Sequence, residues 1–237
     1  MAMSSIIKAS LLQSGIVKHR YVFKKLMKTF LHVGCGHKNK SFCLGFENDN
    51  WKEIRLDIDK NVNPDIVGTL TDMKSVETGS VDAVYSSHNI EHIFPHEVPI
   101  ALREFYRVLK EDGIVVITCP DIQSAGEALT QDKLFQTLFQ GKGRNKSVPE
   151  GYDVPVTAFD ILFGHRETTE DGNIFMVHKT GFTYSLLDRA FYEAGFKVRV
   201  GGRRPEGYDL YLVAFKQKKS EEEVKKIALP FLPGLQF

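Results

Sequence analysis

Short apolar runs alternate with segments of helical spacing along most of the chain, and this alternation constrains the fold more than any other feature. Seven runs have the length and composition of β-strands, at residues 30–33, 53–57, 65–67, 83–86, 114–118, 197–200 and 210–215. The run at 114–118 is β-branched and almost wholly apolar, as expected of a parallel strand that is buried on both faces. Strands that alternate with helices predict βαβ units and a mostly parallel sheet.

The helical segments occupy the spaces between these runs. Apolar residues fall on one stripe over 96–109, which predicts a helix with one buried face. Helices are also expected at 122–140, at 183–194, where Gly195 ends the helix, and near 221–226.

The order of these elements predicts the fold class and the domain plan. Five alternating β/α units, then a helix and two closing strands, indicate an α/β fold with a Rossmann-like, seven-stranded, mostly parallel sheet. We expect helices on both faces, an antiparallel last strand, and an insertion at 141–181 after the fifth strand, because long insertions in compact domains usually carry function. The predicted units are an N-terminal helical cap at 1–28, a main domain at 29–218 that contains this insertion, and a C-terminal helix and tail at 219–237.

Charge and cysteine content exclude several classes of protein. The 237-residue chain has a formal net charge of +1, so we expect no nucleic-acid partner. Cys35, Cys43 and Cys119 lack the paired spacing of a zinc site or of a secreted disulfide scaffold, so we expect no metal and a cytoplasmic location. No apolar run reaches the roughly 18–20 residues that span a bilayer, and no signal peptide is expected.

The two ends of the chain have different characters. Residues 1–28 carry six basic and no acidic residues, which predicts an amphipathic helix that caps the domain. The alternative is a helix that lies on a membrane surface or over an anionic substrate. Residues 229–237 are an apolar tail with two prolines, which packs on the body or at the contact of a homodimer.

A glycine turn follows the first strand. Gly34-Cys35-Gly36 lets the backbone bend sharply and approach a ligand, at the sheet edge where α/β proteins bind ligands. Asp57 ends the second strand 21 residues after Gly36 and can accept hydrogen bonds from two ribose hydroxyls, with Asp59 as its neighbouring competitor. These features fit either a nicotinamide dinucleotide or S-adenosylmethionine.

A third candidate element follows the third strand. Leu70 or Met73 can pack on an adenine ring, and Thr69 or Asp72 can bond its amino group. The alternative for Asp72 is to cap a helical turn.

Several longer motifs resemble the type 11 branch of class I S-adenosylmethionine-dependent methyltransferases. They are Leu31-His32-Val33-Gly34-Cys35-Gly36, Arg55-Leu56-Asp57-Ile58-Asp59, Ser86-Ser87-His88-Asn89-Ile90-Glu91-His92 and Ala101-Leu102-Arg103-Glu104-Phe105-Tyr106-Arg107-Val108-Leu109-Lys110. In addition, His178-Lys179-Thr180-Gly181-Phe182-Thr183 is similar to a segment of predicted bacterial methyltransferases that are often linked to surface-polysaccharide genes.

The resemblance covers about residues 29–216 and implies S-adenosylmethionine as the cofactor, with S-adenosylhomocysteine as its product. Residue chemistry and the resemblance together predict ten residues at the donor, which are Gly34, Cys35, Gly36, Asp57, Ile58, Thr69, Leu70, Asp72, Ser86 and Ser87. The chain departs from the superfamily pattern at His32, Lys38 and Thr69, where an acid, a third glycine and an acid are usual.

Methyl transfer from a sulfonium is an in-line displacement, so the protein mainly aligns the acceptor and excludes water. A hydroxyl acceptor also needs a base, and histidine suits this near neutral pH. The candidate bases are His88 and His92, after the fourth strand, and His178 in the insertion; the alternative for each is a structural hydrogen bond. Asp121 is either an acceptor-site residue or a helix cap.

The favoured function is therefore a methyltransferase (EC 2.1.1.-) that acts on a hydroxyl of a small molecule or glycan. A nicotinamide-dependent oxidoreductase on a similar sheet is the first alternative, which the missing third glycine and the two closing strands disfavour. A non-catalytic protein that binds S-adenosylmethionine or a partner is the second.

Overall fold

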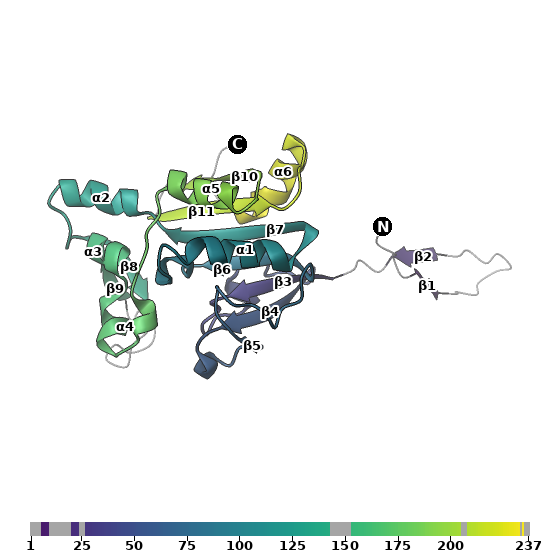
Figure 1. The fold of residues 1–237 in the computed structure, drawn as a ribbon, viewed down its shortest axis with the longest axis horizontal. Coiled ribbons are helices and arrows are strands. Elements are labelled where there is room, and N and C mark those ends of the chain that lie inside the picture. The colour runs from purple at the N-terminus through teal and green to yellow at the C-terminus, as the bar shows by residue number, and fades with distance from the viewer. Residues whose placement is uncertain are drawn as a thin grey trace.

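Seven strands form the central sheet of the computed structural model, which describes residues 6–9, 20–23, 27–142, 153–204, 208–232 and 234. They are β3 (Lys28–Val33), β4 (Trp51–Asp57), β5 (Ile66–Val67), β6 (Val81–Ser87), β7 (Leu109–Pro120), β10 (Val198–Arg203) and β11 (Asp209–Phe215). Their spatial order is β10-β11-β7-β6-β3-β4-β5 (Figure 1). The strands β3 to β7 pair in parallel, and β11 is antiparallel to both of its neighbours. The predicted fold class is confirmed.

One face of the sheet is covered by two amphipathic helices. Helix α1 (Val98–Val108) buries a stripe at helical spacing, and α5 (Tyr184–Glu193) buries Leu187 and Phe191 in the same apolar cluster. The side chain of Thr183 caps the first turn of α5, and Gly195, at φ +110°, follows its end. Both helices lie where the apolar spacing predicts them.

The opposite face is covered from the C-terminal end of the chain. Helix α6 (Glu221–Ala228) begins with a capping box between Ser220 and Glu223, and the 3₁₀ helix η5 (Leu229–Phe231) follows it. Phe231 and Leu232 are buried in the cluster on this face, so the described part of the apolar tail packs on the body. The homodimer contact stays a prediction.

The first three connections between parallel strands lack the predicted helices. Within residues 34–80, all of which the structure describes, only the 3₁₀ helices η1 (Lys40–Phe42) and η2 (Lys60–Val62) occur. Glycine, asparagine and proline are frequent in this stretch and favour turns, so the prediction of five complete β/α units is wrong here.

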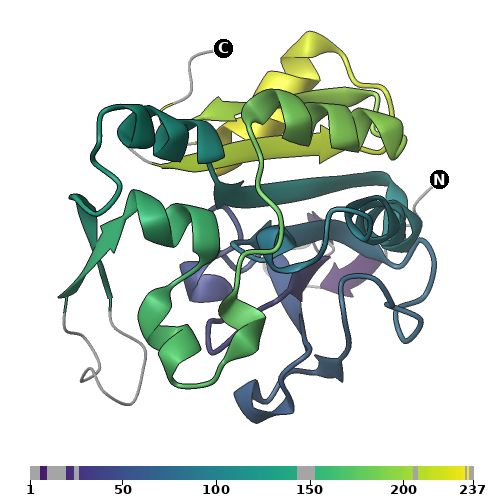
Figure 2. The ribbon, with the colours of Figure 1, turned by 60° about the vertical axis from the view of Figure 1, so that its left-hand side comes forward.

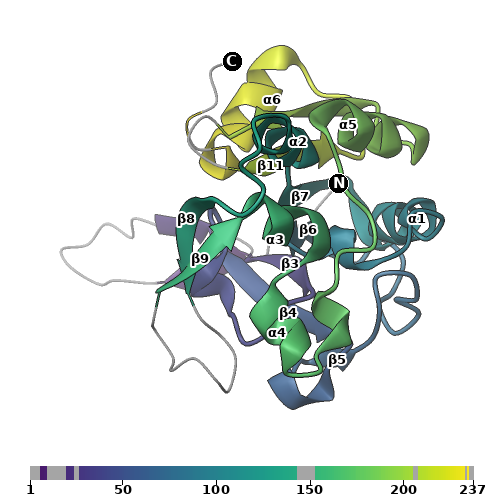
Figure 3. The ribbon, with the colours of Figure 1, turned by 90° about the vertical axis from the view of Figure 1, so that its left-hand side faces the viewer.

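The insertion stands at the edge of the sheet to which the parallel strands point (Figure 1). Helix α2 (Ile122–Thr130) leads into it, and its elements are β8 (Thr137–Lys142), β9 (Asp153–Thr157), α3 (Ala158–Phe163), α4 (Arg166–Glu170) and the 3₁₀ helix η4 (Ile174–Met176). Figures 2 and 3, turned toward that edge, show α3 and α4 in front of the strand ends. The predicted helix over 122–140 is wrong beyond residue 130, because Asp132 turns the chain at φ +55° and β8 pairs with β9.

The N-terminal segment also differs from its prediction. Strands β1 (Ile6–Ala9) and β2 (Arg20–Phe23) pair antiparallel where an amphipathic helix over 1–28 was expected. Both are rich in β-branched and aromatic residues, which favour strands. The remainder of residues 1–26 lies outside the described part of the chain. None of the helices within the described ranges is long and apolar enough to cross a membrane.

Candidate donor and acceptor sites

The glycine turn after β3 combines one crowded and one open position. Gly34 and Gly36 both have positive φ, +62° and +53°, which L side chains rarely adopt. A Cβ on Gly34 would overlap the side chain of Asn89, whereas a Cβ on Gly36 would meet no atom within 4 Å. Gly34 therefore permits close packing within the protein, and Gly36 leaves open space beside the backbone.

Asp57 links this turn to the end of β4. Its Oδ2 accepts a hydrogen bond of 2.7 Å from the Gly36 N–H, and its Oδ1 accepts one of 2.9 Å from the Asp59 N–H. A carboxylate has about four lone pairs, so two acceptor positions remain on Asp57. Asp59 instead caps η2 through Asn61. The structure thus places Asp57, of the two competing acids, against the glycine turn.

Arg55 holds the same turn from the outside, a role that no sequence pattern indicated. Its guanidinium donates to the carbonyl oxygens of Gly36 at 2.6 Å, Lys38 at 3.1 Å and Asn63 at 2.9 Å. One side chain therefore ties together the loops that follow the first and second parallel strands.

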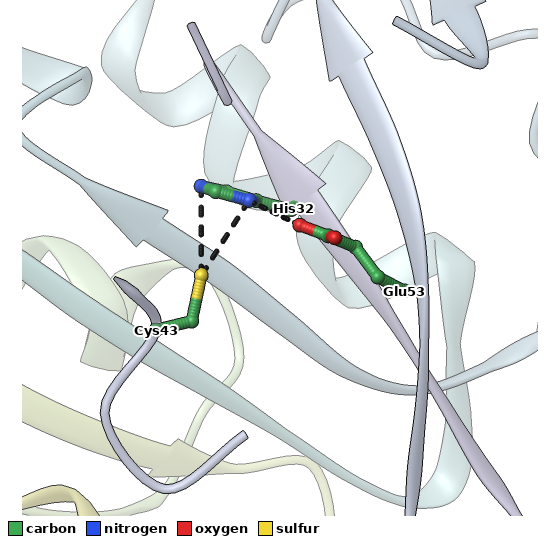
Figure 4. Close-up of side chains that lie close together, drawn as sticks. All are labelled: His32, Cys43 and Glu53. Carbon is green, nitrogen blue, oxygen red and sulfur yellow. Dashed lines mark hydrogen bonds and ion pairs between the residues drawn. The ribbon is translucent and has the colours of Figure 1, made fainter. Parts of the chain in front are cut away.

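A largely buried polar cluster lies on β3, on β4 and on the loop that connects them (Figure 4). His32 Nδ1 lies 2.7 Å from Glu53 Oε1, and the Cys43 sulfur lies to one side of the imidazole, 3.5 Å from Nδ1 and 3.9 Å from Nε2. Glu53 also accepts the Lys40 N–H at 2.9 Å, and burial raises the pKa of the Cys43 thiol to about 12. The unusual His32 is thus satisfied by an acid on the neighbouring strand.

The loop after β5 lies beside Asp57, because the Gly68 N–H donates to the Asp57 carbonyl at 2.9 Å. Thr69 next to it is partly exposed. Leu70 and Met73, by contrast, are buried in the core cluster, and the exposed apolar residues near Asp57 are Ile58, at 46%, and Val67, at 62%.

Asp72 lies at the surface of this loop. Its carboxylate pairs with the Lys74 ammonium at 3.1 Å and accepts the Lys74 N–H at 3.3 Å. These bonds lower the pKa of Asp72. They also correspond to the alternative in which Asp72 caps a local turn.

The end of β6 brings the next predicted residues to the same edge. Ser86 is fully buried, and its hydroxyl has no hydrogen-bond partner among the described residues. Ser87 Oγ accepts from Thr118 Oγ1 at 2.9 Å, and the His88 N–H donates to the Thr118 carbonyl at 3.0 Å. His88 has φ +50°, a left-handed conformation that is uncommon for non-glycine residues.

His88 lies between two carboxylates. Its Nε2 is 3.5 Å from Asp209 Oδ1, and its Nδ1 is 3.7 Å from Glu91 Oε1. Asp209 reaches this place because β11 runs antiparallel to β7, which pairs Asp209 with Pro120. Sequence reasoning missed Asp209, since a residue far along the chain enters the site only through that strand register.

Glu91, His92 and His178 form a buried group next to His88. The rings of the two histidines are 5.0 Å apart, and His92 Nε2 lies 3.9 Å from Glu91 Oε1. Burial raises the pKa of Glu91 to about 8 and lowers the pKa of His92 to about 4, and it also lowers the pKa of His178. The structure therefore brings the three candidate bases together and adds an acid that the sequence marked only as a loop residue.

Asp121 has a structural role. It caps α2 by accepting the Gln123 N–H at 3.0 Å, and its Oδ2 accepts from Arg203 Nε at 2.6 Å. Asp121 is 1% exposed, and these bonds correspond to the helix-cap alternative.

The insertion contains a pocket of about 360 Å³, lined by Pro155, Asp160, His165, Arg166 and Glu170. Lys179 and Thr180, at the end of the insertion, donate backbone hydrogen bonds to the Glu91 carbonyl at 2.8 and 3.1 Å. The insertion is thereby attached to the loop after β6.

The sheet order, with one antiparallel strand between β7 and β10, is that of the Rossmann-like class I methyltransferases that use S-adenosylmethionine. Residues 31–117 match a family model described as the methyltransferase domain. The match to the methyltransferase domain thus runs from the first parallel strand of the sheet to the fifth.

Solved structures share the fold at low sequence identity. A protein from Listeria monocytogenes, assigned as an S-adenosylmethionine-dependent methyltransferase, is 15% identical, with 82% of this chain and 92% of that chain covered and a TM-score of 0.51. A protein from Pyrococcus horikoshii is 14% identical, with 82% and 84% covered and a TM-score of 0.50. No curated protein matches the chain by sequence.

Proposed function

We propose that the protein transfers the methyl group of S-adenosylmethionine to a hydroxyl of a small molecule or glycan. The donor lies between the turn at Gly34–Gly36 and Asp57, and the acceptor lies between His88 and the insertion. The observation that carries this proposal is the open space beside Gly36 next to a carboxylate that keeps two acceptor positions.

The residues at this edge match the parts of the donor. Asp57 can accept from both ribose hydroxyls, and the exposed Ile58 offers an apolar surface beside an adenine ring. Thr69, held next to Asp57, offers a hydroxyl for the edge of the base. At the other end of the turn, Ser86 Oγ and Asn89 Nδ2 are buried and have no hydrogen-bond partner among the described residues. Both atoms can bond the charged amino-acid end of the donor's methionine part.

When bound, the donor supplies an electrophilic methyl group on a sulfonium. The acceptor oxygen forms the new O–C bond as the S–C bond breaks, and the bonding pair stays on sulfur, which leaves as a neutral thioether. The hydroxyl proton passes to His88, whose imidazole lies at the end of β6 between Asp209 and Glu91. The Asp209 carboxylate stabilises the imidazolium that forms.

Calorimetry on the full chain tests the donor site. We expect one equivalent of S-adenosylmethionine or S-adenosylhomocysteine to bind and NAD to give no heat. Binding of NAD with no uptake of either sulfur compound would instead establish the oxidoreductase alternative.

A second experiment tests the acceptor. The protein is incubated with methyl-labelled donor and sets of hydroxyl-bearing and amine-bearing sugars and phenols. Label in an alkali-stable ether linkage supports transfer to oxygen, and label found only on nitrogen would contradict it. Donor binding without transfer to any acceptor would favour the non-catalytic alternative.

A further inference from the structure

We propose that Glu91, His92 and His178 form a binding site for a divalent transition-metal ion, such as Zn²⁺, on the acceptor side of the sheet edge. One potential ligand atom from each residue lies within 4.8 Å of the other two. Two imidazoles and one carboxylate are a ligand set that suits zinc and neighbouring first-row metals.

The hydrogen bonds of the two histidines prepare them as ligands. His92 Nδ1 donates to the Val177 carbonyl at 3.2 Å, and His178 Nδ1 donates to the Ile161 carbonyl at 2.9 Å. A carbonyl oxygen can only accept, so both Nδ1 atoms carry the proton and both Nε2 atoms keep a lone pair. Metal-binding histidines are usually oriented in this way, by a backbone carbonyl that fixes the tautomer.

Glu91 is an independent sign of a missing ligand. It is 1% exposed, and neither carboxylate oxygen has a hydrogen-bond partner among the residues that the structure describes. Ring nitrogens of His88 and His92 lie 3.7 and 3.9 Å from its Oε1. Buried polar atoms are rarely left without a partner, and a bound cation would supply one for these oxygens.

The three ligand atoms, which lie within 4.8 Å of one another, must move closer together to bind zinc. Zinc bonds of about 2.0–2.2 Å place tetrahedral ligand atoms roughly 3.3–3.5 Å apart, so the 3.9 Å between His92 Nε2 and Glu91 Oε1 needs to shorten by about half an ångström.

The other mixed cluster of the fold is different. In the group of His32, Cys43 and Glu53 (Figure 4), the His32 Nδ1 that would face a metal is already engaged with Glu53 at 2.7 Å, and both Glu53 oxygens have partners. The Glu53 oxygens therefore have partners without an ion, whereas the Glu91 oxygens have none among the described residues.

The role of this ion in methyl transfer rests on the proposed function. Three protein ligands leave at least one coordination position, as in catalytic zinc sites, and an acceptor hydroxyl that takes it becomes more acidic. A metal at this place would thus select acceptors that offer oxygen ligands and would hold the reacting oxygen beside His88.

The test uses full-length protein that has been freed of metal with a chelator and then titrated with ZnCl₂, CoCl₂ or MgCl₂. We expect one equivalent of Zn²⁺ or Co²⁺ to bind, with a rise in melting temperature and a visible Co²⁺ absorption band, and no response to Mg²⁺. Glu91→Gln and His178→Ala should each lose at least tenfold in metal affinity, and His96→Ala, a substitution of an exposed histidine, should lose none.

Two results would overturn the site: folded wild-type protein that takes up no Zn²⁺ or Co²⁺, or uptake that Glu91→Gln and His178→Ala leave unchanged. If either variant fails to fold, His92→Ala and the wild-type titration decide. Donor calorimetry on the metal-free protein separates this proposal from the function. Metal uptake without donor binding would leave the metal site standing and refute methyl transfer.

Discussion

The side-chain amide of Asn89 occupies the volume that a Cβ on Gly34 would need. The two residues come from the loops after β3 and β6, which are adjacent in the sheet. The glycine is thus required by a contact within the protein, whereas Gly36, two residues later, faces open space.

This difference predicts that two glycine substitutions separate folding from donor binding. Gly34→Ala should be destabilised by about 3 kcal/mol or more, because it adds overlap with Asn89 to the roughly 1–2 kcal/mol cost of a left-handed alanine. Gly36→Ala should show only the smaller cost but should weaken donor binding. Thermal unfolding and calorimetry on both variants measure this, and equal melting temperatures would contradict it.

Asp57→Ala should weaken S-adenosylmethionine binding by about 100-fold, because two hydrogen bonds to a charged group, each contributing about 1.5 kcal/mol, disappear. The matched control is Asp59→Ala, which removes a neighbouring carboxylate whose role is to cap η2. Calorimetry should separate the two variants, and unchanged affinity in Asp57→Ala would refute the ribose contact.

His88→Asn should lower turnover by about 10²–10⁴ while leaving donor affinity within a factor of about two. Asparagine is chosen because it tolerates the left-handed backbone at this position. Single-turnover rates with labelled donor, compared with His96→Ala, provide the measurement. Full activity in His88→Asn would remove this residue as the base.

Asp121→Ala should reduce the free energy of unfolding by about 2–4 kcal/mol, since it loses a helix cap and a hydrogen bond from Arg203. Glu127→Ala removes the other, exposed partner of Arg203 and should cost less than about 1 kcal/mol. Urea denaturation compares the two, and a similar loss in both would argue against the cap at Asp121.

Asp160 should make stability depend on pH in the acid range. Burial opposes its ionisation, yet hydrogen bonds from Arg166 and Thr157 hold the pKa of Asp160 below its ordinary value. Its stabilising effect is therefore present above the unfolded pKa of about 3.9 and is lost as the pH falls through the lower folded value. The stability difference between wild type and Asp160→Asn should shrink below about pH 4, and a constant difference would contradict the prediction.

Features that depend on residues close together in the sequence could be predicted from the sequence. The stripe of α1, the end of α5 at Gly195, the glycine turn and Asp57 were all predicted from spacing within a few residues. Contacts between distant segments were not predictable in this way. Asp209 joins His88 only through the register of β11 on β7, and β8 forms a strand because β9 pairs with it. Glu91 differs from an ordinary loop acid only through its burial, which depends on the whole fold.

Strand β11 is the last sheet strand to leave the ribosome, yet it lies inside the sheet, between β7 and β10. During synthesis β10 emerges first and has no neighbour to pair with until β11 follows, so β10 can join the sheet only after β11 has paired with β7. A nascent chain can assemble the glycine turn and Asp57 early, but the Asp209 contact with His88 waits for translation to approach the C-terminus. Chains that end before residue 209 should therefore lack the carboxylate that faces His88 Nε2.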